Sequence, residues 1–242
     1  MKLQRKGTRH SHRGVIGVES AIVMIAFVIV AAALAFVVLN MGFTTSQKAK
    51  TTIIAGLEES GSSMQLSGKV TAVGCISTGT CSTTAKLNNT AFPIKVTSGG
   101  DSVDLAAATT AVKYLSNSVE YDDIYAGPLT GAEYRSVALA TTAASTSTDT
   151  SFSEWDGVGS GGTPTGTQAF IYWSVRTNTN AILDQGEHAM LVIGYDISNA
   201  NSADERPGQL DNIRMEIIPA TGASLTVERQ VPVITTTIVD LG

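Results

Sequence analysis

The chain has 242 residues, enough for one domain of ordinary size and an additional segment. Five basic residues and no acid precede Gly14, and without them 11 Lys and Arg stand against 21 Asp and Glu. A remainder so acidic repels the phosphate backbone, so we expect no nucleic-acid partner. Charged residues make up only 15% of the chain, which is typical of an extracellular all-β domain rather than a cytosolic enzyme.

The first long feature is the apolar stretch Ala21 to Leu39, which contains no charged residue. As a helix its 19 residues span about 28 Å, the thickness of a membrane core. The apolar part of a cleaved secretory signal is shorter, roughly 7 to 15 residues. Cleavage after Ala33-Leu34-Ala35 is the alternative, but the length favours a segment that is kept.

The helix is expected to continue beyond this stretch to about Ser60. Ile53, Ile54 and Leu57 recur among polar residues as on a one-sided helix, and Gly61 then interrupts the pattern. A helix of this length, apolar all round in its first half, cannot be covered by one small domain. It needs lipid or other copies of itself.

From Lys69 onward, short runs rich in Val, Ile, Thr and Tyr alternate with turn residues, which predicts an antiparallel β-sandwich. Between these runs, Ala140 to Thr167 is rich in Ser, Thr and Gly and predicts a long exposed loop. That loop is a solvated connector, a site of glycan decoration or a contact between subunits. The clearest predicted strands are Ala169–Arg176, Ala189–Ile197, Ile213–Ile218, Ser224–Arg229 and Val233–Val239.

The beginning of the chain resembles the class III signal of type IV pilin-like proteins, in which a basic leader ending in Gly is clipped before an apolar helix. Here the leader would end in "RKGTRHSHRG", and the scissile bond would join Gly14 to Val15. Within that superfamily the chain resembles the archaeal flagellins, or archaellins. The resemblance is carried by "GVIGVESAIVMIAFVIVAAALAFVVLNMG", "QKAK", "LDQGEHAMLVI" and "VPVITTTIVDLG".

This resemblance implies an α+β fold, a long N-terminal hydrophobic helix followed by an immunoglobulin-like antiparallel β-sandwich. Residues 1–14 would be the removed leader, 15–62 the helix and 69–242 the extracellular domain. The chain would be a structural subunit of the archaeal flagellum (archaellum), an extracellular filament built for swimming. Its partners would be other copies of itself, paralogous subunits, a leader peptidase, the membrane before assembly, and the motor and assembly machinery.

Glu19 is the single ionisable residue between Gly14 and Lys48. A carboxylate among apolar groups costs several kcal/mol unless it is neutralised, so we expect a partner for it. Clipping creates one, because Val15 gains an α-amino group near Glu19 in its own chain and in a neighbouring helix. Alternatively, Glu19 only complements the positive end of the helix dipole. An acid at this place is typical of type IV pilins generally, which keeps an adhesive or sugar-binding pilin as the rival function.

Two candidate modifications lie in the predicted domain. Cys75 and Cys81 are separated by five residues in "VGCISTGTC", and an oxidising exterior favours a disulfide over two buried thiols. Asn88 begins the triplet "NNT", the one match to the N-glycosylation pattern, and we expect it on an exposed turn.

No catalytic, cofactor or metal site is predicted. Clipping leaves His188 as the one histidine, too few for zinc and weak support for a catalytic triad. Acids at Asp122 and Asp123, and at Asp204, Glu205 and Asp211, match no defined calcium loop. The rival pilin would need an aromatic groove, for which the candidates are Trp155, Tyr172 and Trp173.

Overall fold

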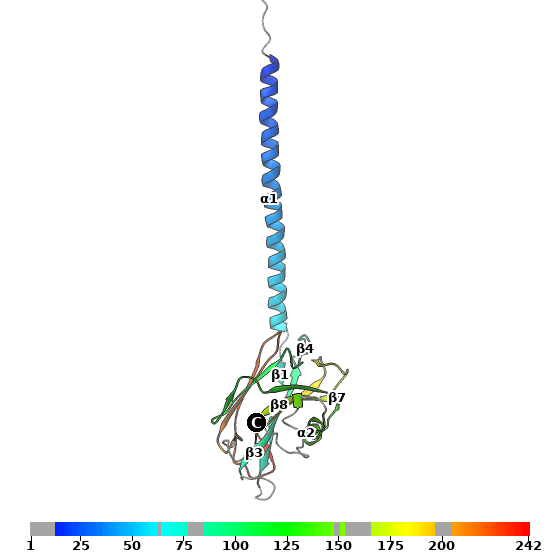
Figure 1. Ribbon diagram of the computed structural model, residues 1–242, viewed down its shortest axis with the longest axis vertical. Coiled ribbons are helices and arrows are strands. Elements are labelled where there is room, and N and C mark those ends of the chain that lie inside the picture. Colours follow the sequence, from blue (N-terminus) through cyan, green and yellow to red (C-terminus); the bar gives the residue numbers. More distant parts are fainter. Residues whose placement is uncertain (1–12, 62–63, 77–84, 148–150, 153–165, 197–204) are drawn as a thin grey trace, which may run out of the picture. The chain divides into compact units, whose positions relative to one another are not determined.

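The computed structural model describes residues 13–61, 64–76, 85–147, 151–152, 166–196 and 205–242, with the side chains of 13–16 and 58–61 left out. The chain divides into two compact units, Met1–Ala55 and Gly56–Gly242. The first unit is helical and the second is built mainly of β-strands (Figure 1). The expected α+β fold class is therefore confirmed.

Helix α1 (Arg13–Gly61) has 49 residues, which corresponds to about 74 Å. Its sequence contains no proline and eight Ala residues, which favour the helix. The predicted end near Ser60 is within one residue of the observed end at Gly61.

The larger sheet has seven strands in the order β13-β2-β3-β10-β8-β7, and β1 also pairs with β3. Neighbouring strands are antiparallel except for β7 and β8. The strands are β1 (Met64–Leu66), β2 (Thr71–Cys75), β3 (Lys86–Val96), β7 (Tyr125–Glu133), β8 (Gln168–Val175), β10 (His188–Gly194) and β13 (Ile238–Asp240).

The second sheet has four strands in the order β12-β11-β5-β6, and β4 pairs with β9 as a separate ribbon. Their bounds are β4 (Val103–Asp104), β5 (Ala111–Leu115), β6 (Glu120–Tyr121), β9 (Ile182–Leu183), β11 (Asn212–Ile218) and β12 (Leu225–Gln230).

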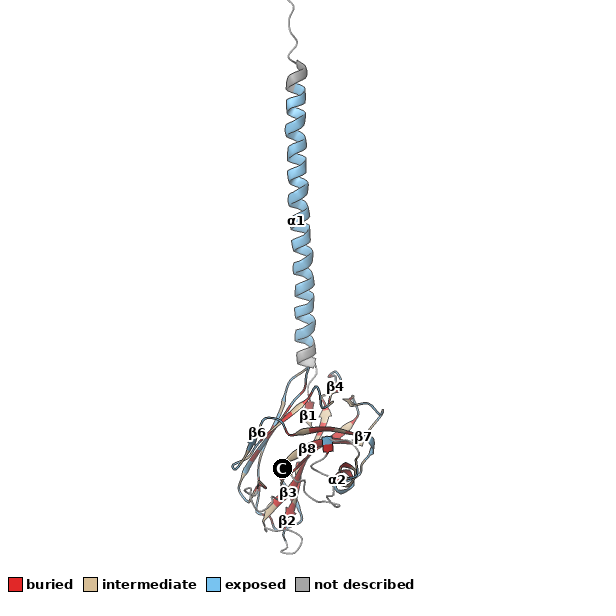
Figure 2. Cartoon of the chain, in the orientation of Figure 1, coloured by how far each residue is buried: buried red, intermediate tan, exposed pale blue. Residues whose placement is uncertain are grey.

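The main core lies between these two sheets. Strand β11 alternates as predicted, with Ile213, Met215 and Ile217 buried while Arg214 faces solvent. Strand β10 lies between β3 and β8, and its residues Leu191 to Ile193 are buried on both sides, as a central strand requires. Figure 2 shows buried residues concentrated on these strands.

A short helix covers the other face of the larger sheet, which corrects the beginning of the exposed loop predicted from Ala140 to Thr167; residues 148–150 and 153–165 of that loop lie outside the described residues. Helix α2 spans Val137–Ser145, and Ser136 caps its N-terminus. The Ser136 Oγ accepts a hydrogen bond from the Leu139 amide at 3.3 Å. Ala140 and Ala144 are buried against Phe170 and other residues of the sheet. The buried side chains of α2 are small, which lets the helix approach the sheet closely. No large apolar residue is needed on this face.

Strands β7 and β8 are parallel, which corrects the expectation of a purely antiparallel sheet. A parallel pair needs a crossover, and the chain between Glu133 and Gln168, with α2 in it, provides one. The missed helix and the unexpected parallel pair are thus one feature of the topology.

The predicted strand Val233–Val239 is mostly wrong, because only Ile238 and Val239 of it belong to β13. The Val231 amide donates to the Asp211 carbonyl at the edge of the smaller sheet, and the Thr237 carbonyl accepts from the Gly74 amide of the larger one. Residues 232–236 cross from one sheet to the other, so they cannot pair continuously with either.

A buried carboxylate organises the loop between β8 and β10. Glu187 is 1% exposed and accepts hydrogen bonds from the Trp173 indole at 3.2 Å and from the amides of Thr177, Asn178 and Asp184 at 2.7, 3.3 and 3.2 Å. Four donors compensate the cost of burying the carboxylate. From the sequence, Glu187 was only part of a turn.

Candidate functional site: the apolar helix

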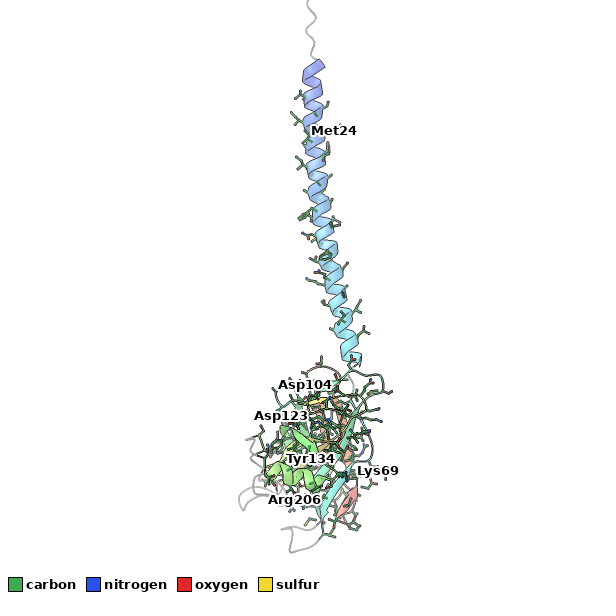
Figure 3. The ribbon with its side chains drawn as sticks, turned by 90° about the vertical axis from the view of Figure 1, so that its right-hand side faces the viewer. Met24, Lys69, Asp104, Asp123, Tyr134 and Arg206 are labelled. Atoms are coloured by element: carbon green, nitrogen blue, oxygen red, sulfur yellow. The ribbon has the colours of Figure 1, made fainter. Side chains whose placement is uncertain are left out.

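Helix α1 exposes apolar side chains all along its length. Phe27, Phe36 and Leu39 are 73%, 68% and 76% exposed, and Figure 2 shows the described part of the helix exposed throughout. Figure 3 shows its side chains, Met24 among them, standing out from the helix. The segment Gly17–Leu57 is long and apolar enough to cross a membrane. An apolar surface of this size requires cover by lipid or protein.

Small residues recur every seven positions along the second half of α1. We call Ala35, Gly42, Ala49 and Gly56 the small-residue stripe. A straight helix drifts by about 20° per seven residues, so the four residues stay on one face. Small residues on one face let two apolar helices approach closely.

The two glycines of the stripe are not explained by the subunit's own packing. A methyl group added at Gly42 or Gly56 would meet no described atom within 4 Å outside the neighbouring turns of the helix itself. Glycine inside a helix costs about 1 kcal/mol relative to alanine. Because no contact with the described residues offsets that cost, the stripe points to contact with another helix. Sequence reasoning missed it, although the seven-residue spacing was visible.

The predicted processing and assembly residues lie at the beginning of α1. Gly14 and Val15 belong to its first turn, and Glu19 is exposed among apolar residues such as Val23 and Phe27. Positions 15 and 19 are four residues apart, so they lie on the same face one turn from each other. The spacing therefore permits the pairing expected after clipping, which stays a prediction.

Threonines make the polar middle of α1 compatible with an apolar environment. The hydroxyls of Thr44 and Thr45 donate to helix carbonyls at 3.0 and 2.7 Å, and those of Thr51 and Thr52 donate to the Lys48 carbonyl at 2.9 Å. These hydroxyls are already satisfied, so they can be buried between helices without losing a partner in water.

Cys75 is buried at the end of β2 and is disulfide-bonded. Cys81 lies outside the described residues, so its pairing with Cys75 stays a prediction. Strands β2 and β3 are antiparallel neighbours, which places the cysteine segment at the connection between them.

Asn88 does not lie on a turn, which corrects the sequence expectation. It is half-buried within β3, and its Oδ1 accepts a hydrogen bond from Arg206 at 3.3 Å. Thr90, the third residue of the triplet, is fully buried and its hydroxyl bonds to that of Tyr195 at 2.8 Å. Glycosylation at Asn88 would therefore have to precede folding, and it stays a prediction.

The other candidates have structural roles in the described part of the chain. His188 begins β10 and its Nδ1 lies 2.9 Å from the Ser67 hydroxyl. Tyr172 and Trp173 are buried in the cores, so these two do not line an exposed groove. Trp155 lies outside the described residues. Among described residues, no group of three His, Cys, Asp or Glu side chains gathers as a metal site would require.

The candidate calcium-binding acids also have protein partners. Asp122 forms an ion pair with Lys113 at 2.8 Å, which lowers the pKa of that carboxyl, and Asp123 accepts from the Val112 and Tyr125 amides. Glu205 accepts from Tyr121 at 2.6 Å. Burial of the Tyr121 hydroxyl and this carboxylate raise the pKa of Tyr121 to about 12. Asp211 accepts from the Gly208 amide, and Asp204 lies outside the described residues.

A long apolar helix without cover, followed by a β-sandwich, defines the class of filament subunits related to type IV pilins. Within that class the chain belongs to the archaeal-type flagellin family, whose model matches residues 14–229. It is 35% identical to probable flagellin 1 of Aeropyrum pernix over 220 residues, which cover 91% of this chain and 92% of that protein. It is also 35% identical over 114 residues to probable flagellin 2 of Archaeoglobus fulgidus, covering 46% and 55% of the two chains.

Two solved structures are similar in fold. One is the archaeal flagellum of Methanospirillum hungatei, with a TM-score of 0.57 and 23% identity over 93% of this chain and 98% of that one. The other is flagellin FlaB1 of Methanocaldococcus jannaschii, with a TM-score of 0.52 and 15% identity over 74% and 96%. The likeness extends over nearly the whole chain for the first structure and over about three quarters of it for the second.

Proposed function

We propose that this chain is the structural subunit of an archaeal flagellum filament, an extracellular appendage for swimming, and that it polymerises through α1. The observation that carries the proposal is the uncovered apolar surface of α1 in a member of the archaeal-type flagellin family. Rotation would come from a motor built of other proteins. Assembly machinery and paralogous subunits would be further partners.

Before assembly, α1 would lie across the cell membrane. The basic residues before Gly14 would stay on the cytoplasmic side, because segments rich in Lys and Arg remain there. A leader peptidase would remove residues 1–14. The helix 15–62 would then leave the lipid, while residues 69–242 would already lie outside the cell.

Polymerisation would exchange lipid contacts for contacts between helices. Lipid chains are as apolar as these side chains, so the hydrophobic effect alone does not drive the exchange. The driving force would come from close packing of the small-residue stripe and from neutralisation of Glu19, neither of which lipid provides. An enzymatic role is not proposed, and the rival adhesive pilin has no described aromatic groove to support it.

Changing Glu19→Gln is expected to leave the domain folded and the leader clipped but to give few or unstable filaments. The Val15 amine then lacks its carboxylate partner in an apolar core, at a cost of several kcal/mol per subunit if it stays charged. An effect through the helix dipole alone would cost only about 0.3 to 1 kcal/mol. Filaments are counted per cell at equal subunit expression, and a count equal to wild type would refute the pairing.

The proposed function is tested first by processing. Filaments sheared from cells that produce this chain should consist of subunits beginning at Val15, as read by N-terminal sequencing. Gly14→Asp should block clipping, so the uncut chain accumulates in the membrane fraction and filaments are lost. Extracellular subunits that begin at Met1 or Phe36, or normal filaments from the variant, would contradict the proposal.

A further inference from the structure

The segment that connects β12 to β13 exposes a surface without charged side chains. From Gln230 to Val239 there is no Asp, Glu, Lys or Arg. Val231, Ile234 and Val239 point inward and are at most 6% exposed. We call the outward-facing residues the C-terminal strip: Pro232, Val233, Thr235, Thr236, Thr237 and Ile238, of which Val233 and Ile238 are 59% and 72% exposed.

The strip continues onto the neighbouring strand. Ile238 is the register partner of Val73 on β2, and the Thr237 carbonyl accepts from the Gly74 amide at 2.8 Å. Ile76, just beyond the end of β2, is 48% exposed. The exposed apolar residues at this edge therefore come from both strands.

The backbone of the strip is open as well. Strand β13 is the end strand of the larger sheet as described, and residues 232–236 belong to no strand. Pro232 has no amide hydrogen, and the amides of residues 233–236 form no hydrogen bond with any described residue. Yet the sequence is rich in β-branched residues, which favour strand pairing. Free edges of this kind are commonly protected by charged side chains, above all Lys, which this strip lacks.

The net negative charge of the rest of the domain bears on which surfaces of two copies can touch. From Lys69 to Gly242 there are 9 Lys and Arg residues against 18 Asp and Glu. Two copies of such a domain repel each other, and the repulsion acts over about 8 Å at physiological salt. A neutral, partly apolar strip is a place where one copy can touch another without bringing like charges together.

We propose that the C-terminal strip is a contact surface between the outer domains of neighbouring copies in the filament. This proposal rests on the proposed function, because it needs a polymer in which the domains are held close. In the filament the strip of one copy would meet a different surface of the next copy. A contact of that kind repeats without closing, as a helical filament requires.

The test introduces one negative charge into the strip of the full-length chain. Val233→Asp and Thr235→Asp both change exposed residues outside the strands, so the domain should fold and the leader should be clipped as in wild type. Filaments should be at least tenfold fewer, or should dissociate at low salt and be recovered at high salt, where the repulsion is screened. Val233→Asn, which is polar without charge, should be affected much less.

The matched control is Leu139→Asp on α2, where the replaced residue is 57% exposed. It makes the same kind of change away from the strip and should give wild-type filaments. The proposal is overturned if the strip variants form filaments with wild-type numbers and salt resistance, or if Leu139→Asp is equally defective. Absence of filaments from the wild-type chain would instead reject the proposed function, so the two failures are distinguishable.

Discussion

Cells that produce the Gly42→Leu variant are expected to make no filaments, although the subunit is clipped and its domain folds. Gly42 lies in the middle of the small-residue stripe. We expect two helices of the filament to approach each other most closely there. An isobutyl group at such a contact forces the helices apart, and overpacking typically costs about 1 to 3 kcal/mol at each contact. Every subunit repeats that cost. Filaments are counted by electron microscopy at equal amounts of clipped subunit.

The control for this variant is Met41→Leu, one position earlier. Met41 is 68% exposed and points about 100° away from Gly42 around the helix. Exchanging one apolar side chain for another there should leave filaments near wild type. A methyl group at Gly42 meets no described atom within 4 Å outside the neighbouring turns of its own helix, so the side chain of Gly42→Leu starts in open space within the subunit. Wild-type filament numbers from Gly42→Leu would show that the stripe is not the closest contact.

Glu187→Ala is expected to cause the largest loss of domain stability, about 3 kcal/mol or more. The change leaves the Trp173 indole and three backbone amides without their buried acceptor, and unsatisfied buried donors cost about 1 to 3 kcal/mol each before relaxation. For a domain of this size, 3 kcal/mol lowers the midpoint of thermal unfolding by roughly 6 to 12 °C. The measurement is thermal unfolding of the full-length chain in detergent, followed by near-UV circular dichroism.

The comparison for this prediction is Glu228→Ala on β12. Glu228 is exposed and its carboxylate makes no hydrogen bond or ion pair with a described residue, so its loss should cost less than about 0.5 kcal/mol. Equal midpoints for the two variants would contradict the role assigned to Glu187.

The sequence could predict the elements that depend on a long or regular pattern. The uncharged stretch from Ala21 to Leu39 predicts α1, and the alternation of Ile213, Met215 and Ile217 with polar residues predicts β11. Helix α2 was missed because its buried face consists of Ala140, Thr141 and Ala144, which carry too little apolar character to show a helical period. The cap at Ser136 was the remaining local signal.

Two further errors have a common cause in tertiary context. Residues 233–236 have the composition of a strand but cross between two sheets, so they pair continuously with neither within the subunit. Asn88 and Asn89 look like a turn, yet both lie inside β3, where Asn88 bonds to Arg206 from a distant part of the chain. Local propensity contains no information about such partners.

The candidate site was only partly visible in the sequence. Gly14 and Val15 could be named from the resemblance to class III signals, and Glu19 because it is the single ionisable residue in the apolar stretch; all three roles stay predictions. The small-residue stripe required the additional knowledge that Gly42 has open space around it in the folded subunit. Glu187 could not be separated from other acids in turns, because its four donors converge only after the strands have paired.

In the proposed filament, α1 is buried against the α1 helices of other copies. Electron cryo-microscopy of filaments sheared from producing cells, at a resolution that shows side chains, measures this directly. We expect clipped helices in the filament core, with Ala35, Gly42, Ala49 and Gly56 at their closest approach. A core formed by the β-domains, or helices that remain exposed to solvent or lipid along this stripe, would contradict it.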